Sequence, residues 1–350
     1  SRQSRGLGDV YKRQGIESFK DLSQFMTTTP HNTTELMSAY LGTEQPGAAQ
    51  DAVVPPGMRP EHFKVPKCTG NLKDNKDAKL WRAAMNVEVS NLFDRGCVKV
   101  MTQAEAEQHP NYSKPILTTW VFTVKTDEKG NAYRLRSRLV ARGDMTIEGL
   151  HYDQLFSPVV SMDSIRTLFA LAAGLPTYDV YQADISAAFI NADLDSHVWV
   201  KPPFQFAKTG SDGKPVLWKL VKALYGLKSS PKSWYDCFVT AIKDLEGEHS
   251  TGTVKVDQLI SDPCIFIISK GNEKIYCSLY VDDLCCVSSS VTVREWFMDT
   301  LDKRFDLQKA ETGACKYLLG IAVMVDRKGN RICLSQAAAI DKIVLSQGLS

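Results

Sequence analysis

The chain has 350 residues and a formal net charge of only +2 at pH 7, with 43% hydrophobic and 23% charged residues. These values are ordinary for a globular protein and exclude one that binds nucleic acid over a uniformly basic surface, so such affinity must come from local patches. No apolar run reaches the roughly 18 residues that predict a membrane span. The length allows two or three subdomains around a sizeable core.

The nine cysteines form no CxxC pair and no Cys/His cluster. This pattern predicts buried free thiols in a reducing compartment. It argues against structural zinc, which needs four ligands at suitable spacings.

The N-terminal part of the chain carries few signals of regular structure. Residues 1–14 (SRQSRGLGDVYKRQ) are basic and aperiodic, and they resemble translated sequencing-adapter sequence, so we exclude them from the fold. Residues 15–75 are polar and rich in Thr, Pro, Asn and Gly, which predicts a poorly ordered linker. We expect the folded domain to span residues 76–350, beginning with a helix capped by Asp77.

Helices and strands follow one another in mixed order along the rest of the chain. The helix after Asp77 has Leu80, Ala84, Val87 and Leu92 on one face and stops at Gly96. This mixed order predicts an α+β protein with an antiparallel sheet. The further predicted elements are a hairpin (119–125 and 133–140), a helix (163–173), a strand (177–184), a helical turn (187–191), a loop (201–215), a helix (228–245), strands (264–269 and 275–281), a helix (293–305), strands (317–325 and 331–334) and a helix (337–345).

Two adjacent aspartates stand in a segment that otherwise carries no charge. Asp282 and Asp283 lie within IYCSLYVDDLCCVSSSVTV, residues 275–293. Two strand-like runs separated by two residues predict a β-hairpin with the acids at its tip. Like charges beside apolar walls repel, and a divalent cation relieves the conflict by binding their oxygens. The pair therefore predicts a metal site.

A third acid, Asp184, ends the predicted strand 177–184. Together with Asp282 and Asp283 it could complete a site for two-metal phosphoryl transfer, because carboxylates suit magnesium. Taken alone, Asp184 also fits a structural role.

The predicted hairpin before residue 143 is basic. Arg136 and Arg138 are two residues apart on one strand and therefore point the same way, as two phosphate ligands should. This pattern predicts a lid that contacts a triphosphate or a template backbone, with a solvated hairpin face as the alternative. The cations of the hairpin are Lys125, Lys129, Arg134, Arg136, Arg138 and Arg142.

A glycine turn precedes the predicted helix 228–245, in the sequence LYGLKSSP (224–231). Gly226 would let the backbone approach a ligand closely. Lys228 and two serine hydroxyls supply donors at the N-terminus of a helix, which favours anions. A glycine turn before a helix is also common where no ligand binds.

In this order the motifs resemble the reverse transcriptase domain of copia-type LTR retrotransposons. The resemblance covers about residues 77–350, and its specificity lies in several blocks in the correct order. The matching blocks are Trp120-Val121-Phe122 through Arg138–Gly143, Phe156–Val160 with Ser164-Ile165-Arg166, Asp184–Phe189, Lys222–Lys228 with Pro231 and Trp234-Tyr235, Tyr280–Asp283, and Tyr317–Ile321.

The resemblance implies a right-hand polymerase with fingers, an antiparallel-sheet palm and a partial thumb. Asp184, Asp282 and Asp283 correspond to the catalytic triad of the palm. The first acid and one of the pair would bind two Mg²⁺ ions, or Mn²⁺ in their place. The carbonyl of Ile185 would be a further metal ligand.

Other residues are given roles in nucleotide binding by the same resemblance. Phe189 would lie under the incoming sugar and clash with a 2′-hydroxyl, which selects deoxynucleotides; without the family it would be an ordinary core aromatic. Tyr225 and Gly226 would line the nucleotide pocket. Either Arg136 or Arg138 would contact the triphosphate.

The implied function is that of an RNA-directed DNA polymerase, a nucleotidyltransferase of a retrotransposon. Its partners would be an RNA template, a DNA or RNA primer, dNTPs, and the integrase and ribonuclease H of a parent polyprotein, with no membrane. Leu318-Leu319-Gly320 would lie at the primer terminus. We expect a polyprotein fragment cut within the thumb, located inside cells in the cytoplasm, in virus-like particles or in the nucleus.

Two alternatives stay open. The chain could be a truncated, catalytically inactive remnant that only binds nucleic acid. It could also be another two-metal nucleotidyl transferase built on a palm-like sheet, in which case it would prefer a DNA template.

Overall fold

The computed structural model describes most of the chain, and it divides into two compact units. The first unit comprises residues 1–155 and 192–233, and the second comprises 156–191 and 234–350. Our predictions for residues 1–14 and 15–53 lie outside the described residues. The described residues are 54–127, 130–175, 177–210, 213–246, 254–309 and 312–348.

None of the helices in these ranges combines the length and apolar character that crossing a membrane requires.

Residues 54–75 are ordered, so the predicted linker is wrong for this stretch. They form two short 3-10 helices, η1 (Pro60–His62) and η2 (Thr69–Leu72). The amide of Ala132 donates to the Met58 carbonyl at 2.7 Å, and Phe63 is buried. Backbone hydrogen bonds and the burial of apolar side chains therefore order this segment, although its polar composition predicted a poorly ordered linker.

The first unit contains two antiparallel sheets. One is the predicted hairpin of β2 and β3, and the other has the strand order β1-β6-β5. We did not predict the second sheet, whose buried centre includes Trp199 and Trp218. The elements are α5 (Ala78–Asp94), β1 (Val98–Thr102), α6 (Gln103–Glu107), β2 (Thr118–Thr126), β3 (Ala132–Ala141), η3 (Gly143–Met145), β5 (Asp193–Val200), η5 (Phe204–Phe206) and β6 (Val216–Lys222).

Helix α5 begins directly after Asp77, as predicted, but the Asp77 side chain makes no capping hydrogen bond, and the buried face of the helix is rotated from the predicted one. Leu80 and Val87 are only half-buried. Trp81 takes the central position, with its ring 5.4 Å from that of Phe122 in an edge-on contact. The buried side chains are Trp81, Ala83, Ala84, Met85, Val89 and Leu92.

The second unit is built on a six-stranded sheet in the order β11-β4-β10-β9-β8-β7. Its neighbouring strands pair antiparallel, which confirms the predicted α+β class with an antiparallel sheet. Its elements are α7 (Met162–Gly174), β4 (Asp179–Asp184), η4 (Ala188–Asn191), most of α8 (Ser230–Asp244), β7 (Val254–Gln258), β8 (Ile265–Lys270), β9 (Glu273–Tyr280), β10 (Asp283–Ser288), α9 (Val291–Phe305), β11 (Gly313–Ala314), β12 (Tyr317–Leu318), β13 (Ile321–Asp326), β14 (Arg331–Ser335) and α10 (Ala337–Ser346).

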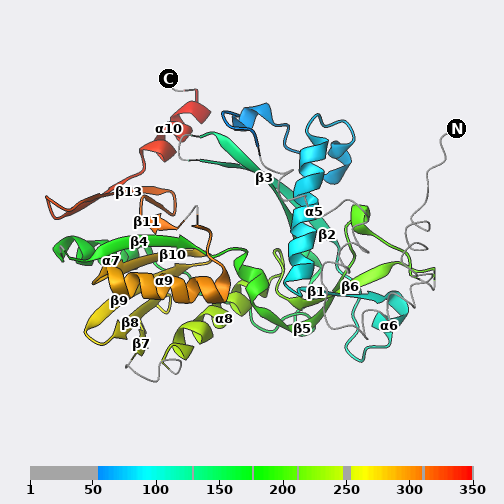
Figure 1. Cartoon of the computed structure of the whole chain (residues 1–350). Helices are drawn as coiled ribbons and strands as arrows, with labels where there is room; N and C mark the ends of the chain where they lie inside the picture. Colours follow the sequence, from blue (N-terminus) through cyan, green and yellow to red (C-terminus); the bar gives the residue numbers. More distant parts are fainter. Residues whose placement is uncertain are drawn as a thin grey trace. The chain divides into compact units, whose positions relative to one another are not determined.

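Helices cover both faces of this sheet. Helix α7 packs with Cys285 and Val287 of β10, and its predicted inner face is buried as expected. Successive strand residues point to opposite faces, so Phe266 lies on the face opposite to Ile265, which packs with α7. On that opposite face the ring of Phe266 lies 5.7 Å from the ring of Phe238 of α8. Helices α8 and α9 therefore cover the other side of the sheet. Figure 1 shows α9 lying across the strands. The sheet that carries Asp184 and Asp283 is thus a buried central layer.

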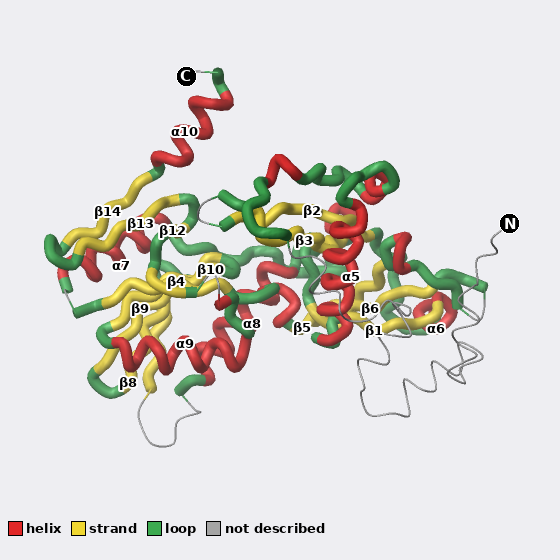
Figure 2. The backbone as a smooth tube through the Cα atoms, turned by 45° about the horizontal axis from the view of Figure 1, so that its top comes forward, coloured by secondary structure: helices red, strands yellow, loops and turns green. Residues whose placement is uncertain are grey.

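The predicted strand 317–325 is interrupted by a tight turn. Leu319 and Gly320 have φ values of 49° and 80°, and Leu318 pairs with Ile321 across them. Two central residues with positive φ are typical of a type I′ hairpin. The strand is therefore split into β12 and β13, and Figure 2 shows the C-terminal helix α10 continuing beyond the β13–β14 ribbon.

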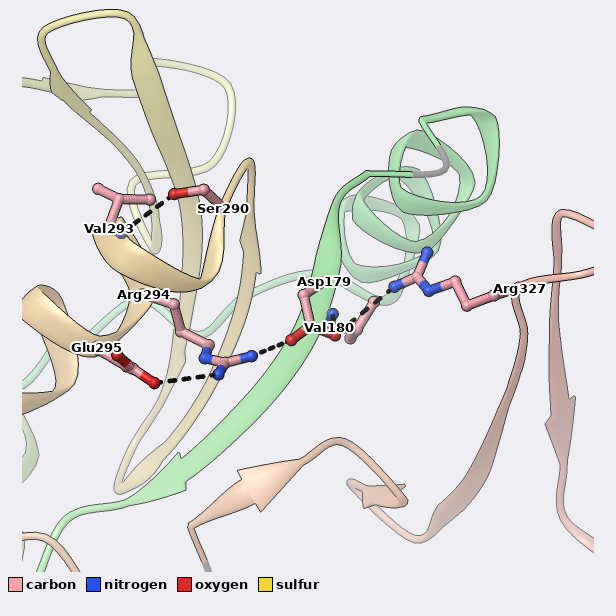
Figure 3. A network of polar contacts seen from close by, with 7 residues as sticks. All are labelled: Asp179, Val180, Ser290, Val293, Arg294, Glu295 and Arg327. Atoms are coloured by element: carbon pink, nitrogen blue, oxygen red, sulfur yellow. Dashed lines mark hydrogen bonds and ion pairs between the residues drawn. The ribbon is translucent and has the colours of Figure 1, made fainter.

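The start of β4 is held by an ionic network, drawn in Figure 3. The Asp179 carboxylate accepts a hydrogen bond from Arg294 of α9, and Arg327 Nη2 lies 3.8 Å from the same carboxylate. Arg327 also donates to the Ala172 carbonyl at 3.1 Å. These contacts tie the strand that ends in Asp184 to α9, to α7 and to the turn after β13.

A buried carboxylate anchors the N-terminus of α7. Asp262 is 6% exposed. It accepts hydrogen bonds from the Ser161 amide at 2.9 Å, the Ser164 hydroxyl at 2.6 Å and the Cys264 amide at 3.1 Å. Burial raises the pKa of Asp262, but these hydrogen bonds to the charged form outweigh burial and leave the pKa below its usual value.

Replacing Asp262 with alanine is expected to lower the free energy of unfolding by about 2–3 kcal/mol, because three donors lose a charged acceptor. Since the folded pKa is depressed, the carboxylate contributes its stability above the unfolded pKa of about 3.9 and loses it as pH falls further. Urea unfolding at pH 7 and pH 3 measures both effects. The difference between Asp262→Ala and the unsubstituted chain should shrink at the lower pH, and a constant difference would contradict the assignment.

All nine cysteines are free thiols, as predicted, but only six are buried, because Cys68 and Cys333 are exposed and Cys237 is half-buried. Burial raises the pKa of Cys97 and of Cys264 to about 12. Thiols with such pKa values stay protonated and unreactive at neutral pH.

Candidate active site

The aspartate pair lies at the β9–β10 hairpin, one residue away from the predicted position. Tyr280 and Asp283 are paired, so the two-residue turn consists of Val281 and Asp282. We predicted both acids at the tip. Instead, Asp282 is in the turn and Asp283 is the first residue of β10.

This register brings two of the three predicted acids together. Asp283 is the direct partner of Asp184 across the β4–β10 ladder. Directly opposed residues of an antiparallel pair project to the same face, with Cβ atoms about 4.5–5.5 Å apart. Asp184 is 8% exposed. Two carboxylates this close repel unless a cation or hydrogen-bond donors stand between them.

The third acid is connected to the same strand end through its backbone. The amide of Ile185 donates to the Asp282 carbonyl at 3.0 Å. Ile185 itself is fully buried, at 0% exposure. The end of β4 and the β9–β10 turn are therefore joined at the place where the acids lie.

Gln308 is a residue of this site that sequence analysis missed. Its side-chain amide donates to the Asp184 carboxylate, and its backbone amide donates to the Asp184 carbonyl at 2.9 Å. A bridge between Ile185 and Leu307 aligns this segment beside β4. No motif marked Gln308, because its contact depends on a segment that follows Asp184 by more than 100 residues.

The donor set suits a divalent cation but is not a closed cage. Among the residues that the structure describes, no three His, Cys, Asp or Glu side chains are grouped to hold a metal ion. Magnesium is commonly bound by one or two carboxylates and completes its shell with water and substrate phosphates. The opposed carboxylates of Asp184 and Asp283 meet that requirement, and the roles of Asp282 and of the Ile185 carbonyl stay predictions.

Phe189 lies on the short helix η4, five residues after Asp184. Its neighbours Ala188 and Ile190 are buried at 2% and 3% exposure, whereas Phe189 is half-buried. The side chain of Asn191 donates to the Ser186 carbonyl at 3.3 Å and closes this loop. Phe189 is thus more exposed than a core aromatic would be, and its contact with a sugar stays a prediction.

The basic hairpin of the first unit has the predicted alternation. Leu135, Ser137, Leu139 and Ala141 are buried, and the arginines between them are on the other face. Arg138 and Arg136 are opposite Val121 and Thr123, and Lys125 is opposite Arg134. The cations of this face are Lys125, Arg134, Arg136 and Arg138.

Two other cations of the predicted set do not belong to this face. Lys129 lies outside the described residues. Arg142 follows β3 and binds Asp144 through two hydrogen bonds of 2.8 and 2.7 Å.

A half-buried glutamate, Glu88, supports this hairpin from α5. The Glu88 carboxylate accepts a hydrogen bond from the Leu139 amide at 3.2 Å. Burial raises the pKa of Glu88, and the hydrogen bond and the charges of Arg136 and Arg138 offset only part of that rise. Glu88 thereby accepts the hydrogen bond of an amide on the open edge of β3. Sequence analysis did not identify this residue.

The glycine turn makes its closest contact with the hairpin. The Ala141 amide donates to the Tyr225 carbonyl at 2.7 Å. A Cβ on Gly226, whose φ is +88°, would lie 2.2 Å from the Ala141 carbonyl oxygen. The close approach that we assigned to a ligand is therefore made by β3. The ring of Tyr225 is covered by the Arg138 guanidinium, 5.2 Å from its centroid.

The donors that we predicted for an anion are mostly engaged elsewhere. The Ser230 hydroxyl donates to the Leu224 carbonyl at 2.6 Å and is fully buried. Lys228 donates to the Tyr152 hydroxyl at 3.2 Å. At the start of this helix, the Ser230 hydroxyl and the Lys228 ammonium group therefore already have hydrogen-bond acceptors within the protein.

Gly226→Ala is expected to lower the free energy of unfolding by about 3 kcal/mol, because it combines positive φ with a backbone clash. Gly149→Ala is the matched control. Gly149 has a φ of +75°, but no atom lies within 4 Å of a Cβ built there. Gly149→Ala should therefore lower the free energy of unfolding by only about 1–2 kcal/mol. Thermal unfolding of both variants measures the difference, and equal losses would contradict the close contact with β3.

Comparison with known proteins agrees with these motifs. The sequence model of the family described as reverse transcriptase (RNA-dependent DNA polymerase) matches residues 105–350. The chain is 32% identical over 262 residues to the Retrovirus-related Pol polyprotein from transposon TNT 1-94 of Nicotiana tabacum, which covers 75% of the chain and 18% of the polyprotein. It is 29% identical over 250 residues to the Retrovirus-related Pol polyprotein from transposon RE1 of Arabidopsis thaliana, covering 71% and 16%.

A third relative is the Retrovirus-related Pol polyprotein from transposon RE2 of Arabidopsis thaliana, 32% identical over 202 residues, which are 58% of the chain and 13% of that polyprotein. The chain belongs to the reverse transcriptase family, and the matches confirm the resemblance to the domain of copia-type elements. It spans less than a fifth of the length of these relatives. The family uses divalent metal ions.

Proposed function

We propose that this chain catalyses RNA-directed DNA synthesis, in which a primer 3′-hydroxyl attacks the α-phosphate of a dNTP and pyrophosphate leaves. The single observation that carries the proposal is the register of Asp283 opposite Asp184 at the end of a buried sheet. Magnesium, when bound, would offset the negative charge of the phosphates and activate the attacking oxygen. Membership of the reverse transcriptase family supports the same reaction.

We assign different roles to the residues of the site. Asp184, Asp282, Asp283 and the Ile185 carbonyl would hold two Mg²⁺ ions, for which Mn²⁺ could substitute. Phe189 would restrict the sugar to the deoxy form by clashing with a 2′-hydroxyl, and its half-buried side chain is accessible enough for such a contact.

The basic hairpin would contact the triphosphate. Arg136 and Arg138 share one face with Lys125 and Arg134, and the guanidinium of Arg138 lies over the Tyr225 ring. Arginine suits this role because its planar donors match phosphate oxygens. Tyr225 and Gly226 belong to the turn that is hydrogen-bonded to the end of β3, and they would line the nucleotide pocket beside these arginines.

We further propose that the two units act as the fingers and palm of a right-hand polymerase, with the segment from β12 onward as the start of a thumb. Leu318-Leu319-Gly320 forms the β12–β13 turn and would contact the primer terminus. Partners would be an RNA template with its primer, and the other segments of a Pol polyprotein like those of the relatives. We propose an intracellular location.

The test is primer extension by the full chain with an oligo(dT) primer on poly(rA), dTTP and Mg²⁺. Incorporation that needs the divalent ion and proceeds on RNA supports the proposal. Extension on poly(dA) alone would instead indicate a DNA-templated nucleotidyl transferase.

A second candidate is nucleic-acid binding without catalysis, and one observation favours it. The Asp184 carboxylate already accepts a hydrogen bond from the side-chain amide of Gln308, so one of the proposed metal ligands has a protein partner. Tight binding of primer–template, with no incorporation in either Mg²⁺ or Mn²⁺, would support this candidate.

A further inference from the structure

The turn that carries Asp282 is in a strained conformation. Val281, the first of its two central residues, has a φ of +57°. Positive φ in a β-branched residue is a genuine outlier, because its side chain crowds the backbone. Such a conformation persists only when the surrounding structure over-determines it. Something must therefore hold this turn.

The carbonyl of Val281 is held by a buried tryptophan. The indole Nε1 of Trp234, on α8, donates to it at 2.5 Å. Trp234 is 1% exposed. Its ring is fixed by edge-on contact with Phe305 at 5.2 Å and by Phe238 at 5.8 Å. The indole is thus locked by packing and cannot follow the turn if the turn moves.

The second carbonyl of the turn is held as well. The Asp282 carbonyl accepts from the Ile185 amide at 3.0 Å. That bond fixes the turn to the end of β4, and the Trp234 bond fixes it to α8. The turn therefore has two anchors, one made by the strand of Asp184 and one made by a side chain.

We infer that Trp234 is a positioning residue for the metal-binding turn. It keeps Val281 in the strained conformation and thereby sets the direction of the Asp282 and Asp283 carboxylates. This inference rests on the proposed function. Trp234 does not contact substrate; it acts through the Val281 carbonyl. A tryptophan that serves only as core would also need a partner for its buried N–H, so metal binding and kcat, rather than the bond itself, distinguish the two roles.

The test compares single and double variants of the full chain. Trp234→Phe keeps an aromatic ring and removes the N–H donor. Trp296→Phe is the control, because Trp296 lies on α9 of the same unit with its ring under Lys270 at 4.1 Å. Val281→Gly removes the cost of positive φ, so the turn no longer needs its anchor, and the double variant combines it with Trp234→Phe.

Two readouts separate positioning from simple stability. The first is kcat and KM for dTTP on poly(rA)/oligo(dT). The second is the Kd for Mn²⁺ alone, measured by electron paramagnetic resonance of the free ion, which needs no catalysis. Partners that orient metal ligands typically account for about 10- to 100-fold in metal affinity or activity.

We expect Trp234→Phe to lower kcat by at least about 10-fold, with KM for dTTP nearly unchanged, and to weaken Mn²⁺ binding. In the Val281→Gly background the same change should cost no more than about threefold, because neighbouring residues couple. The inference is overturned if Trp234→Phe behaves like Trp296→Phe, or if the losses multiply in the double variant. If the unsubstituted chain fails to extend primers, the proposed function fails, and the Mn²⁺ measurement still decides the role of Trp234.

Discussion

Asp184→Asn and Asp283→Asn should each lower the rate of nucleotide incorporation by at least about 100-fold, the upper range for residues that only orient metal ligands. Asparagine keeps the size of the side chain but removes the charge that binds a divalent cation. The two residues are partners in one ladder, so loss of either leaves a single carboxylate at the strand end. Single-turnover primer extension on poly(rA)/oligo(dT) measures the rate.

The control for these substitutions is Asp257→Asn. Asp257 lies on β7 of the same sheet and pairs with Lys255 at the surface, with its side chain 48% exposed. It should retain full incorporation. Removing the repulsion between Asp184 and Asp283 should also leave the protein folded, so thermal unfolding must show no loss. Activity within threefold of the unsubstituted chain in either variant would contradict the assignment of this site.

Phe189→Val should increase the use of ribonucleotides relative to deoxynucleotides by roughly 10- to 100-fold, the range that changes in pocket shape give. The smaller side chain would remove the clash with a 2′-hydroxyl while keeping an apolar contact. The ratio of kcat/KM for dTTP and UTP on poly(rA) measures the effect.

Phe204→Val is the matched control, because Phe204 is an aromatic residue at 90% exposure on η5 and outside the proposed site. It should leave the ratio unchanged. If Phe189→Val lowers incorporation of both nucleotides equally, the ring supports the fold and does not select the sugar.

The sequence predicted elements well where one periodicity was strong. The inner face of α7 is buried as predicted, and so are Trp234, Phe238 and Ile242 on α8. In both helices the apolar residues recur at three- or four-residue spacing, which defines one face. The face of α5 was harder to predict, because Trp81 contacts Phe122 of a distant strand.

Predictions were weaker where a partner far along the chain decides the structure. In the sheet β1-β6-β5, strand β1 pairs with β6 more than 100 residues later, and short apolar runs do not reveal such pairing. The same holds within the site. The acids and their motif were visible in the sequence, but their register was off by one residue, because a turn type fixed by Val281 is not readable from residue types.

Residues that support the site also lacked a sequence signal. Gln308 contacts Asp184 and Glu88 contacts the Leu139 amide, and both contacts depend on the folded chain. Gly226 was correctly singled out as a position of close approach, but its neighbour is the backbone of β3. A glycine shows that something lies close and does not say what it is.

The central claim is that the end of β4 and the β9–β10 turn bind divalent cations together. Cleavage of the backbone by Fe²⁺ and peroxide tests it most directly, because the bound ion generates radicals that cut the chain nearby. Cuts are expected at both Asp184 and Asp282-Asp283, and excess Mg²⁺ should suppress both. Cleavage at only one of the two segments, or cuts that Mg²⁺ does not suppress, would contradict the claim.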